Sequence, residues 1–223
     1  MLTFSIPSSY VAFRTFRNAV LAFFLCIGPV FAKPLVLVAF GDSLTQGYGL
    51  PADQGFVPQL QAYLGADNVT VINAGVSGDT TAGGVSRLDW TLTPDVQAVI
   101  VNLGGNDLLR GLPPEVTRAN MDKIAATITG RGIALLIVAM QAPPNYGPDY
   151  KTAFDAIYPE MAAKYGAMLT APYFTPITGG DPDPSKARDF MQDDGIHPNA
   201  AGVAKLVAGH GSEIRAFLES VKK

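Results

Sequence analysis

The fold is decided by the stretch 35–49, which reads LVLVAFGDSLTQGYG. Its first six residues are apolar on both faces, as expected for a strand buried between two helical layers. The strand ends at Gly41, where the chain must turn. Ligands bind at the carboxyl ends of the strands in open parallel sheets, so Ser43 is expected to face a cleft. The alternative is that Ser43 caps the next helix, and this stretch alone does not separate the two roles.

Four further apolar runs follow, and segments with the helical period separate them. We expect strands over 69–72, 96–103, 133–140 and 168–170, and helices over 56–64, 80–88, 116–128, 151–165 and 199–221. Pro159 is expected to kink the fourth helix, and residues 172–190 read as a loop. Strands that alternate with helices predict an α/β fold. The expected form is a flavodoxin-like three-layer α/β/α sandwich with a five-stranded parallel sheet of order 2-1-3-4-5.

The first 32 of the 223 residues differ from the rest in composition. Arg14 and Arg17 are their only charges, and an apolar run over 19–27 is too short to span a membrane. Small residues stand where a signal peptidase reads the chain before Ala32. We therefore predict a signal peptide over 1–32, cleaved after Ala32, one folded domain over 33–223, and a periplasmic or secreted location. The alternative is an uncleaved amphipathic or buried N-terminal segment.

Cleavage after Ala32 leaves 14 basic and 19 acidic residues, a net charge of −5, and removes Cys26, the only cysteine. An acidic chain without a cluster of Lys and Arg lacks the electrostatic footprint of a nucleic-acid-binding protein. The mature chain would have no disulfide and no stable membrane anchor, and we expect a monomer.

A serine hydroxyl is a weak nucleophile at neutral pH, so Ser43 needs a base to take its proton. His197 is the candidate, because it follows a polar turn that is expected at the same edge of the sheet. A carboxylate that orients the imidazole is available from Asp194, three residues earlier, with Asp193 as the rival. The other histidine of the predicted domain, His210, is expected to face solvent or to lie at a helix end.

Two glycine-rich turns supply candidate donors for the negative oxygen of a tetrahedral intermediate. Gly78 offers a backbone N–H that no side chain obstructs, and Asn106 offers its side-chain amide. Donors aimed at that oxygen contribute about 3–4 kcal/mol each. The alternative is that both residues serve only their turns.

Other chemistries fit the sequence poorly. Metal ligation by Asp42, Asp193, Asp194 and His197 is disfavoured, because this set lacks the multiple His or Cys ligands of zinc sites. No G-x-x-x-x-G-K-[ST] motif occurs, and the first turn lacks G-x-G-x-x-G. Thr45 stands where the α/β-hydrolase elbow G-x-S-x-G requires glycine. We expect no metal and no cofactor.

Four blocks resemble, in order, the motifs of the SGNH (GDSL) hydrolase family. They are GDSL (41–44), NAGVSGDT (73–80), GGND (104–107) and DDGIHPN (193–199). Within the family the chain looks like the bacterial periplasmic group of thioesterase I, protease I and lysophospholipase L1, and like arylesterases. The resemblance runs from about residue 35 to 199, and residues 81–84 depart from the group's pattern. Domain 33–223 is thereby expected to be an SGNH hydrolase domain.

The resemblance implies a role for each candidate residue. Ser43 is the nucleophile and also gives its backbone N–H to the oxyanion hole. Gly78 and Asn106 are the other two donors. His197 is the base, and Asp194 is the acid that orients it.

The predicted function is a serine hydrolase that cleaves carboxylic esters and thioesters through an acyl-enzyme on Ser43, of the arylesterase, acyl-CoA thioesterase or lysophospholipase type. The expected partner is a small-molecule acyl ester or thioester, with lysophospholipids included, and by resemblance the loop 141–147 contacts it. An alternative reaction on the same fold is carbohydrate O-deacetylation or acyl transfer. A third hypothesis, a binding module for a small anion, leaves Asp194 and His197 unexplained.

Overall fold

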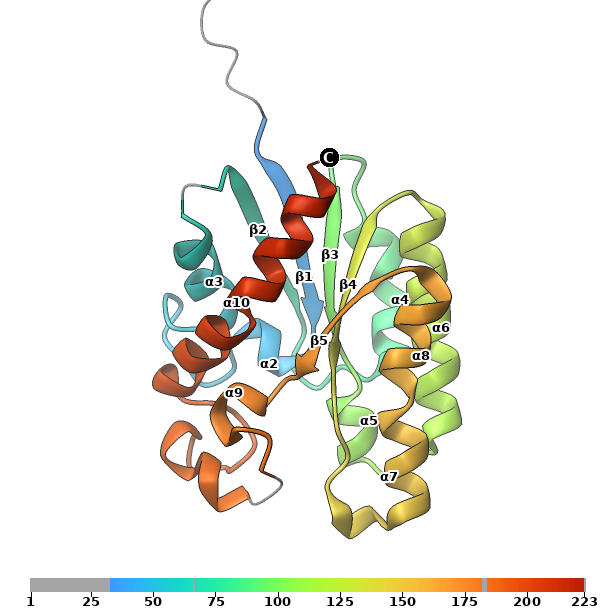
Figure 1. The fold of residues 1–223 in the computed structure, drawn as a ribbon, viewed down its shortest axis with the longest axis vertical. Helices are drawn as coiled ribbons and strands as arrows, with labels where there is room; N and C mark the ends of the chain where they lie inside the picture. Colours follow the sequence, from blue (N-terminus) through green and yellow to red (C-terminus); the bar gives the residue numbers. More distant parts are fainter. Residues whose placement is uncertain (1–32, 66, 182–183, 223) are drawn as a thin grey trace, which may run out of the picture. The chain divides into compact units, whose positions relative to one another are not determined.

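The computed structural model describes residues 33–65, 67–181 and 184–222, so the predicted signal peptide over 1–32 lies outside the described residues. One parallel sheet of order β2-β1-β3-β4-β5 organises the chain from Pro34 onward (Figure 1). This confirms the predicted strand number and order. The strands are β1 (Leu35–Gly41), β2 (Val69–Gly75), β3 (Ala98–Asn102), β4 (Ala134–Ala139) and β5 (Met168–Pro172).

Burial across the sheet explains the strand sequences. Every residue of β1 and β3 is buried, whereas the edge strands β2 and β5 are buried only in part. A central strand covered on both faces must be apolar at consecutive positions, which is why 35–40 and 98–101 contain no polar residue.

Helices cover both faces of the sheet (Figure 1). On one face α3 (Phe56–Leu64) packs against α10 (Ala200–Val221). On the other, α6 (Pro114–Gly130) packs between α4 (Thr81–Thr91) and α8 (Ile157–Tyr165). This arrangement confirms the three-layer sandwich. Among the described residues, no helix is both long enough and apolar enough to cross a membrane.

Short polar side chains fix where the long helices begin. Asn199 caps α10 by accepting a hydrogen bond from the Gly202 N–H (2.9 Å), and Thr80 caps α4 through the Gly83 N–H (3.3 Å). Such caps satisfy donors that the first turn leaves without a partner. Pro114 begins α6 at a position where its missing N–H costs no helical hydrogen bond.

Two expectations about the second half of the chain are wrong. Residues 151–165 do not form one kinked helix, because α7 (Pro148–Asp155) ends and α8 begins on either side of Ala156. Pro159 is the third residue of α8, so it lies in a first turn and breaks no hydrogen bond. The segment 172–190 is not simply a loop, since it contains α9 (Thr175–Thr178) and the 3₁₀-helix η2 (Pro184–Phe190).

Gly84 of α4 gives a test of how tightly this helix packs on the sheet. A Cβ atom there would lie 2.6 Å from Leu103 Cδ1 and 3.3 Å from Phe40 Cε1. We expect Gly84→Ala to lower the free energy of unfolding by about 1–3 kcal/mol in urea titrations, because overpacking forces neighbours to move.

The matched control is Gly130→Ala at the end of α6, where a Cβ atom would meet nothing within 4 Å. Alanine is the better helix former, so this variant should be as stable as the wild type or slightly more stable. Equal effects of the two substitutions would contradict the tight packing of α4.

Candidate active site

Ser43 lies where β1 ends and the short helix α2 (Ser43–Gln46) begins. The N-cap of this helix is Asp42, whose Oδ1 accepts a hydrogen bond from the Leu44 N–H (3.0 Å). The capping role that the sequence left open for Ser43 therefore belongs to Asp42. Ser43 is the first residue of the helix, and its hydroxyl contacts another segment.

The segment that the Ser43 hydroxyl contacts is the turn that contains His197. The Ser43 Oγ lies 2.8 Å from His197 Nε2, although the two residues are 154 positions apart. His197 Nδ1 lies 2.6 Å from Asp194 Oδ2, so Asp194 rather than Asp193 contacts the imidazole. An ionised carboxylate only accepts hydrogen bonds, so Nδ1 carries a proton and Nε2 is left to accept the Ser43 O–H. We call these three residues the hydrogen-bonded triad.

The environment of Asp194 keeps it ionised. Partial burial acts to raise its pKa, but this is outweighed by hydrogen bonds from the His197 backbone N–H (3.0 Å), the His197 ring and the Ile196 N–H (2.9 Å). Together with the charge of His197, they lower the Asp194 pKa from 3.8 to about 2. The carboxylate is therefore negatively charged at neutral pH and able to stabilise an imidazolium.

Two further residues, Tyr48 and Gln192, hold His197 in place. The Tyr48 ring lies against the imidazole, with 4.7 Å between ring centroids. Gln192 donates from its backbone N–H to the His197 carbonyl (2.7 Å), and its Nε2 donates to the carbonyls of Tyr48 (2.8 Å) and Pro198 (3.0 Å). The loop after α2 is thereby tied to the turn that carries the histidine.

Asn106 is on α5 (Gly105–Leu109), which follows β3. The helix begins after Gly104, which has a φ of 113°, and a Cβ atom at this position would lie 2.2 Å from Tyr158 Oη. Only glycine fits both conditions. The Asn106 Nδ2 donates to Asp42 Oδ2 (3.2 Å), so the amide lies beside the residue that precedes Ser43.

Gly78 lies in the turn after β2 and has a φ of 82°. Within the described part of the chain, its N–H donates to no protein acceptor. Its carbonyl accepts a hydrogen bond from Arg110 Nη2 (2.8 Å), and Arg110 directly follows α5. Arg110 therefore connects the turn of Gly78 to the helix that carries Asn106.

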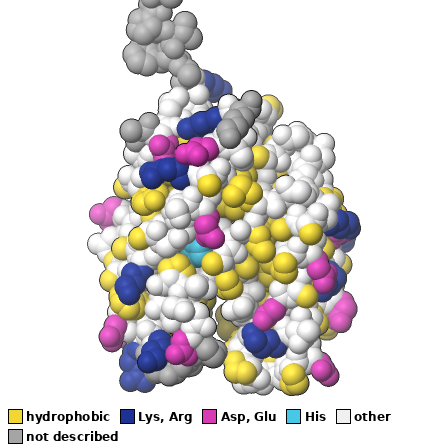
Figure 2. Space-filling view, in the orientation of Figure 1, with side chains coloured by type: hydrophobic (Ala, Val, Ile, Leu, Met, Phe, Trp, Pro, Cys, Tyr) yellow, Lys and Arg dark blue, Asp and Glu magenta, His cyan; other side chains and the backbone are white. Residues whose placement is uncertain are grey.

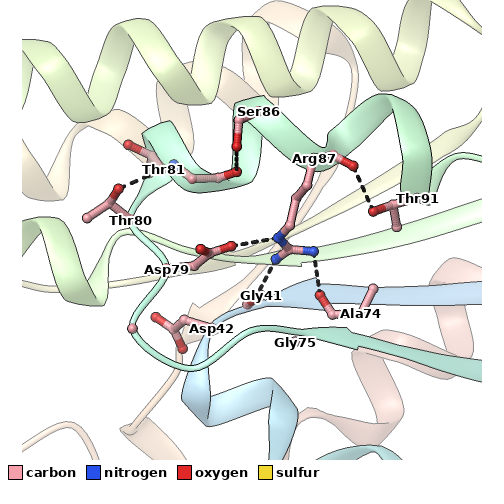
Figure 3. A network of polar contacts seen from close by, with 12 residues as sticks. Gly41, Asp42, Ala74, Gly75, Asp79, Thr80, Thr81, Ser86, Arg87 and Thr91 are labelled. Carbon is pink, nitrogen blue, oxygen red and sulfur yellow. Dashed lines mark hydrogen bonds and ion pairs between the residues drawn. The ribbon is translucent and has the colours of Figure 1, made fainter.

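Arg87 of α4 fixes the ends of β1 and β2 relative to one another (Figure 3). Its Nη2 donates to the Gly41 carbonyl (2.8 Å), its Nη1 to the Ala74 carbonyl (2.9 Å), and its Nε to Asp79 Oδ2 (2.6 Å). A guanidinium holds several donors in one rigid plane, so three partners define its position and theirs. The turns after both strands are fixed in this way.

Asp107 gives a second buried connection. It is fully buried and accepts hydrogen bonds from the Thr81 N–H (2.8 Å), the Thr81 hydroxyl and the Thr117 hydroxyl (3.3 Å). These contacts join α5 to the starts of α4 and α6.

Asp42 is the most unusual ionisable group near Ser43. It is only 2% exposed. Burial raises its pKa from 3.8 to about 6, against the opposing effects of the Leu44 N–H, the Asn106 amide and the charge of His197. A carboxyl group with such a pKa changes its protonation state close to physiological pH.

A cavity of about 400 Å³ extends from Ser43 and Asn106, a volume within the usual range of ligand pockets. It lies between the loop after β4 and the segment after β5, and Figure 2 shows a hollow in the lower part of the view. Most of its lining is apolar, including Leu108, Met140, Pro143, Phe174, Met191 and Ile196.

The expectation for His210 is wrong. This residue of α10 is 2% exposed, and its side chain lies against Tyr173, which directly follows β5. Nε2 lies 2.9 Å from the Tyr173 carbonyl, and Nδ1 lies 3.1 Å from Glu213 Oε2. Both neighbours are acceptors, and the ring also stacks on Tyr173. His210 therefore joins two elements of the fold and is not a surface residue.

A serine, a histidine and a carboxylate in one hydrogen-bonded line are the constellation that serine hydrolases use for acyl transfer. Comparison with known proteins gives the same class. The model of the GDSL-like Lipase/Acylhydrolase family matches residues 39–205, and the chain belongs to this family.

Individual relatives are similar over most of their length. Esterase TesA of Pseudomonas aeruginosa is 38% identical over 179 residues, which cover 79% of this chain and 86% of that protein. Thioesterase 1/protease 1/lysophospholipase L1 of Escherichia coli K12 is 37% identical, with coverage of 73% and 75%. The crystal structure of TesA superimposes with a TM-score of 0.72 at 36% identity, with coverage of 82% and 99%.

Sequence reasoning missed several residues that hold the site together. Asp42 was considered only as a metal ligand, and the contacts of Tyr48, Arg87 and Arg110 were not foreseen. The one available signal was position, because Asp42 lies in a motif block and Tyr48 and Arg110 lie within a few residues of one, whereas Arg87 lies further along, on the helix that follows the second block. Their partners are backbone carbonyls and side chains far away in the sequence, which no local pattern reveals.

The raised pKa of Asp42 predicts a pH dependence of stability. The native state favours the protonated form, so this stabilising contribution is complete below about pH 4 and is lost as the pH rises through 6. Relative to Asp42→Asn, the wild type should therefore lose on the order of 3 kcal/mol of unfolding free energy between pH 4 and pH 8. Urea titrations across this range measure the difference.

Asp122→Asn is the control, because the hydrogen bond from Lys164 lowers the pKa of Asp122. Relative to Asp122→Asn, the wild type should therefore show no such loss of unfolding free energy between pH 4 and pH 8. A constant difference between the wild type and Asp42→Asn at all pH values would contradict the burial effect.

Proposed function

We propose that this protein is a serine esterase that hydrolyses carboxylic esters and thioesters through an acyl-enzyme on Ser43. The observation that carries the proposal is the 2.8 Å contact between Ser43 Oγ and His197 Nε2, with Asp194 on the opposite ring nitrogen. A hydroxyl whose proton can pass directly to an oriented imidazole is an activated nucleophile.

Acylation follows from this geometry. His197 Nε2 takes the Ser43 proton while Oγ forms a bond to the substrate carbonyl carbon. The electron pair of the carbonyl moves to its oxygen, which accepts hydrogen bonds from the backbone N–H groups of Ser43 and Gly78 and from the Asn106 amide. The bond to the alcohol or thiol then breaks, and His197 gives its proton to that leaving group.

Deacylation repeats the sequence with water. His197 takes one proton from the water as its oxygen bonds to the acyl carbon. The intermediate collapses, the bond to Ser43 Oγ breaks, and His197 returns the proton to the serine. The products are a carboxylic acid and free enzyme. Asp194 remains ionised throughout and stabilises the imidazolium in both halves of the reaction.

The apolar cavity supports an acyl ester or thioester as the substrate class, because its lining suits a hydrocarbon or aryl group beside Ser43. The names of the relatives, which include an esterase and a thioesterase/lysophospholipase, support the same class. Lysophospholipids therefore belong to the proposed substrates.

We also propose that residues 1–32 are an export signal and that the mature enzyme acts in the periplasm or outside the cell. The charge and hydropathy pattern of these residues supports this, as does the absence of cysteine from the mature chain.

Replacement of the nucleophile is the direct test of the mechanism. Ser43→Ala should lower kcat for p-nitrophenyl acyl esters by on the order of 10⁴-fold or more, since no other group can form the acyl-enzyme. Initial rates at saturating substrate measure the loss.

Ser86→Ala is the matched control, because Ser86 is an exposed residue of α4 that only donates to the Gly83 carbonyl. It should keep wild-type turnover. Near wild-type turnover of Ser43→Ala would rule out the mechanism.

The export proposal predicts a defined N-terminus. When the full chain is expressed in a Gram-negative bacterium, N-terminal sequencing of the periplasmic protein should begin at Lys33. Retention of residues 1–32 on the exported protein would contradict it.

A further inference from the structure

The acylation and deacylation steps leave one buried ionisable group beside the nucleophile without a role. Asp42 directly precedes Ser43, lines the same cavity and is 2% exposed. Both of its carboxylate oxygens are engaged: Oδ1 accepts from the Leu44 N–H at 3.0 Å, and Oδ2 accepts from Asn106 Nδ2 at 3.2 Å. A buried charge is costly, so its retention at this point calls for an explanation.

The contact with Asn106 supplies one. An amide side chain can turn either its oxygen or its nitrogen toward a neighbour, and the two ends have opposite hydrogen-bonding character. An ionised carboxylate only accepts, so it selects the nitrogen. One N–H of Asn106 then points to Asp42, and the second N–H on the same nitrogen remains available as a donor.

We propose that Asp42 is a positioning residue of the oxyanion hole, whose ionised carboxylate holds the Asn106 amide with its nitrogen toward Ser43. This inference rests on the proposed function, since it assigns Asn106 to the oxygen of the tetrahedral intermediate. Asp42 touches no reacting atom and acts through Asn106.

Protonation of Asp42 reverses the selection. A neutral carboxyl group has an O–H that donates, and this favours the Asn106 oxygen in place of its nitrogen. The amide nitrogen then turns away from Ser43, and the donor is lost. Because burial raises the Asp42 pKa to about 6, the change falls within the pH range in which esterases are assayed.

The groups around Asp42 are consistent with this titration. A positive charge on His197, from the turn before α10, favours the carboxylate form of Asp42. Tyr158 of α8 and Tyr173 after β5 are fully buried, and burial raises the pKa of each phenol, with the charge of Asp42 adding to the effect. Both therefore stay neutral. The guanidinium of Arg87 is bound to Asp79 and two carbonyls (Figure 3).

Asp42→Asn is a well-matched variant. It keeps the size of the side chain, and asparagine caps a helix as well as aspartate does, so the bond to the Leu44 N–H and the start of α2 should be retained. The new amide then turns its NH₂ toward Asn106 and favours the Asn106 oxygen. The variant thus mimics the protonated state at every pH.

A double-mutant cycle at pH 8 tests whether Asp42 acts through Asn106. Loss of one oxyanion donor lowers kcat by roughly 10²–10³-fold, which is the expected effect of Asn106→Ala. Asp42→Asn should lower kcat by about 10-fold to 10²-fold, with KM changed by less than about 3-fold. In the Asn106→Ala background, the same Asp42→Asn substitution should lower kcat by less than about 2-fold.

A pH profile gives a second readout that does not depend on how an Asp42 variant folds. In the wild type, protonation of Asp42 should lower kcat/KM by about 10-fold to 10²-fold, so the acid limb of log kcat/KM should be steeper around pH 6 than it is in Asn106→Ala. In Asn106→Ala the protonation state of Asp42 no longer matters, and this additional drop should disappear.

The outcomes separate this inference from the proposed function. If Asp42→Asn lowers kcat equally in both backgrounds, or if the acid limb keeps the same slope in Asn106→Ala, then Asp42 does not act through Asn106 and the inference is overturned, while acyl transfer by Ser43 stands. If Asn106→Ala leaves kcat unchanged, the oxyanion role of Asn106 fails and the inference fails with it. A failure of the proposed acyl transfer would show in a different assay, as near wild-type turnover of Ser43→Ala.

Discussion

The hydrogen bond between Ser43 and His197 is the contact on which the rest of this site depends, and it joins the helix after the first strand to the turn before the last helix. Its geometry is set by the layer formed by α3 and α10. The turn of His197 leads into α10, and α10 packs on α3, which follows the Ser43 loop. Gln59 on α3 donates to the Ala200 carbonyl (3.3 Å), and Arg215 on α10 donates to the Tyr63 carbonyl (3.1 Å). Helix packing thus holds the base against the nucleophile.

Polar groups that would destabilise an ordinary core organise the carboxyl edge of this sheet. Asp42, Asp107 and Arg87 are buried or half-buried, and each is satisfied by several specific partners. Removal of one partner from such a network leaves another group unsatisfied, so the network is rigid once it is formed. That rigidity suits a site whose donors must already be aligned when charge develops on a substrate oxygen.

The periodicity of apolar residues was enough to predict the five strands and the three layers, because burial on both faces imposes a pattern that a short window records. The strand order was predicted from the flavodoxin-like fold that such an alternation of strands and helices fits. Helical elements of four to seven residues, such as α9 and η2, are too short to show the helical period and were missed. The break at Ala156 was hidden because apolar spacing continues across it. The burial of His210 could not be predicted, since it depends on the Tyr173 carbonyl and Glu213 together. Motif positions located Ser43, His197 and Asp194, but only the structure shows that these side chains meet. The link from Asp42 to Asn106 spans 64 positions and leaves no local signal.

The central claim is that the hydrogen bond from Ser43 to His197 makes Ser43 a nucleophile. The most direct measurement is peptide mapping by mass spectrometry after reaction of the folded protein with a fluorophosphonate, which bonds to an activated serine oxygen as fluoride leaves. The account predicts one adduct per chain, on the peptide that contains Ser43, and no adduct in a His197→Ala variant that retains its fold. An unlabelled wild-type protein, an adduct on a different residue, or equal labelling without the imidazole would contradict it.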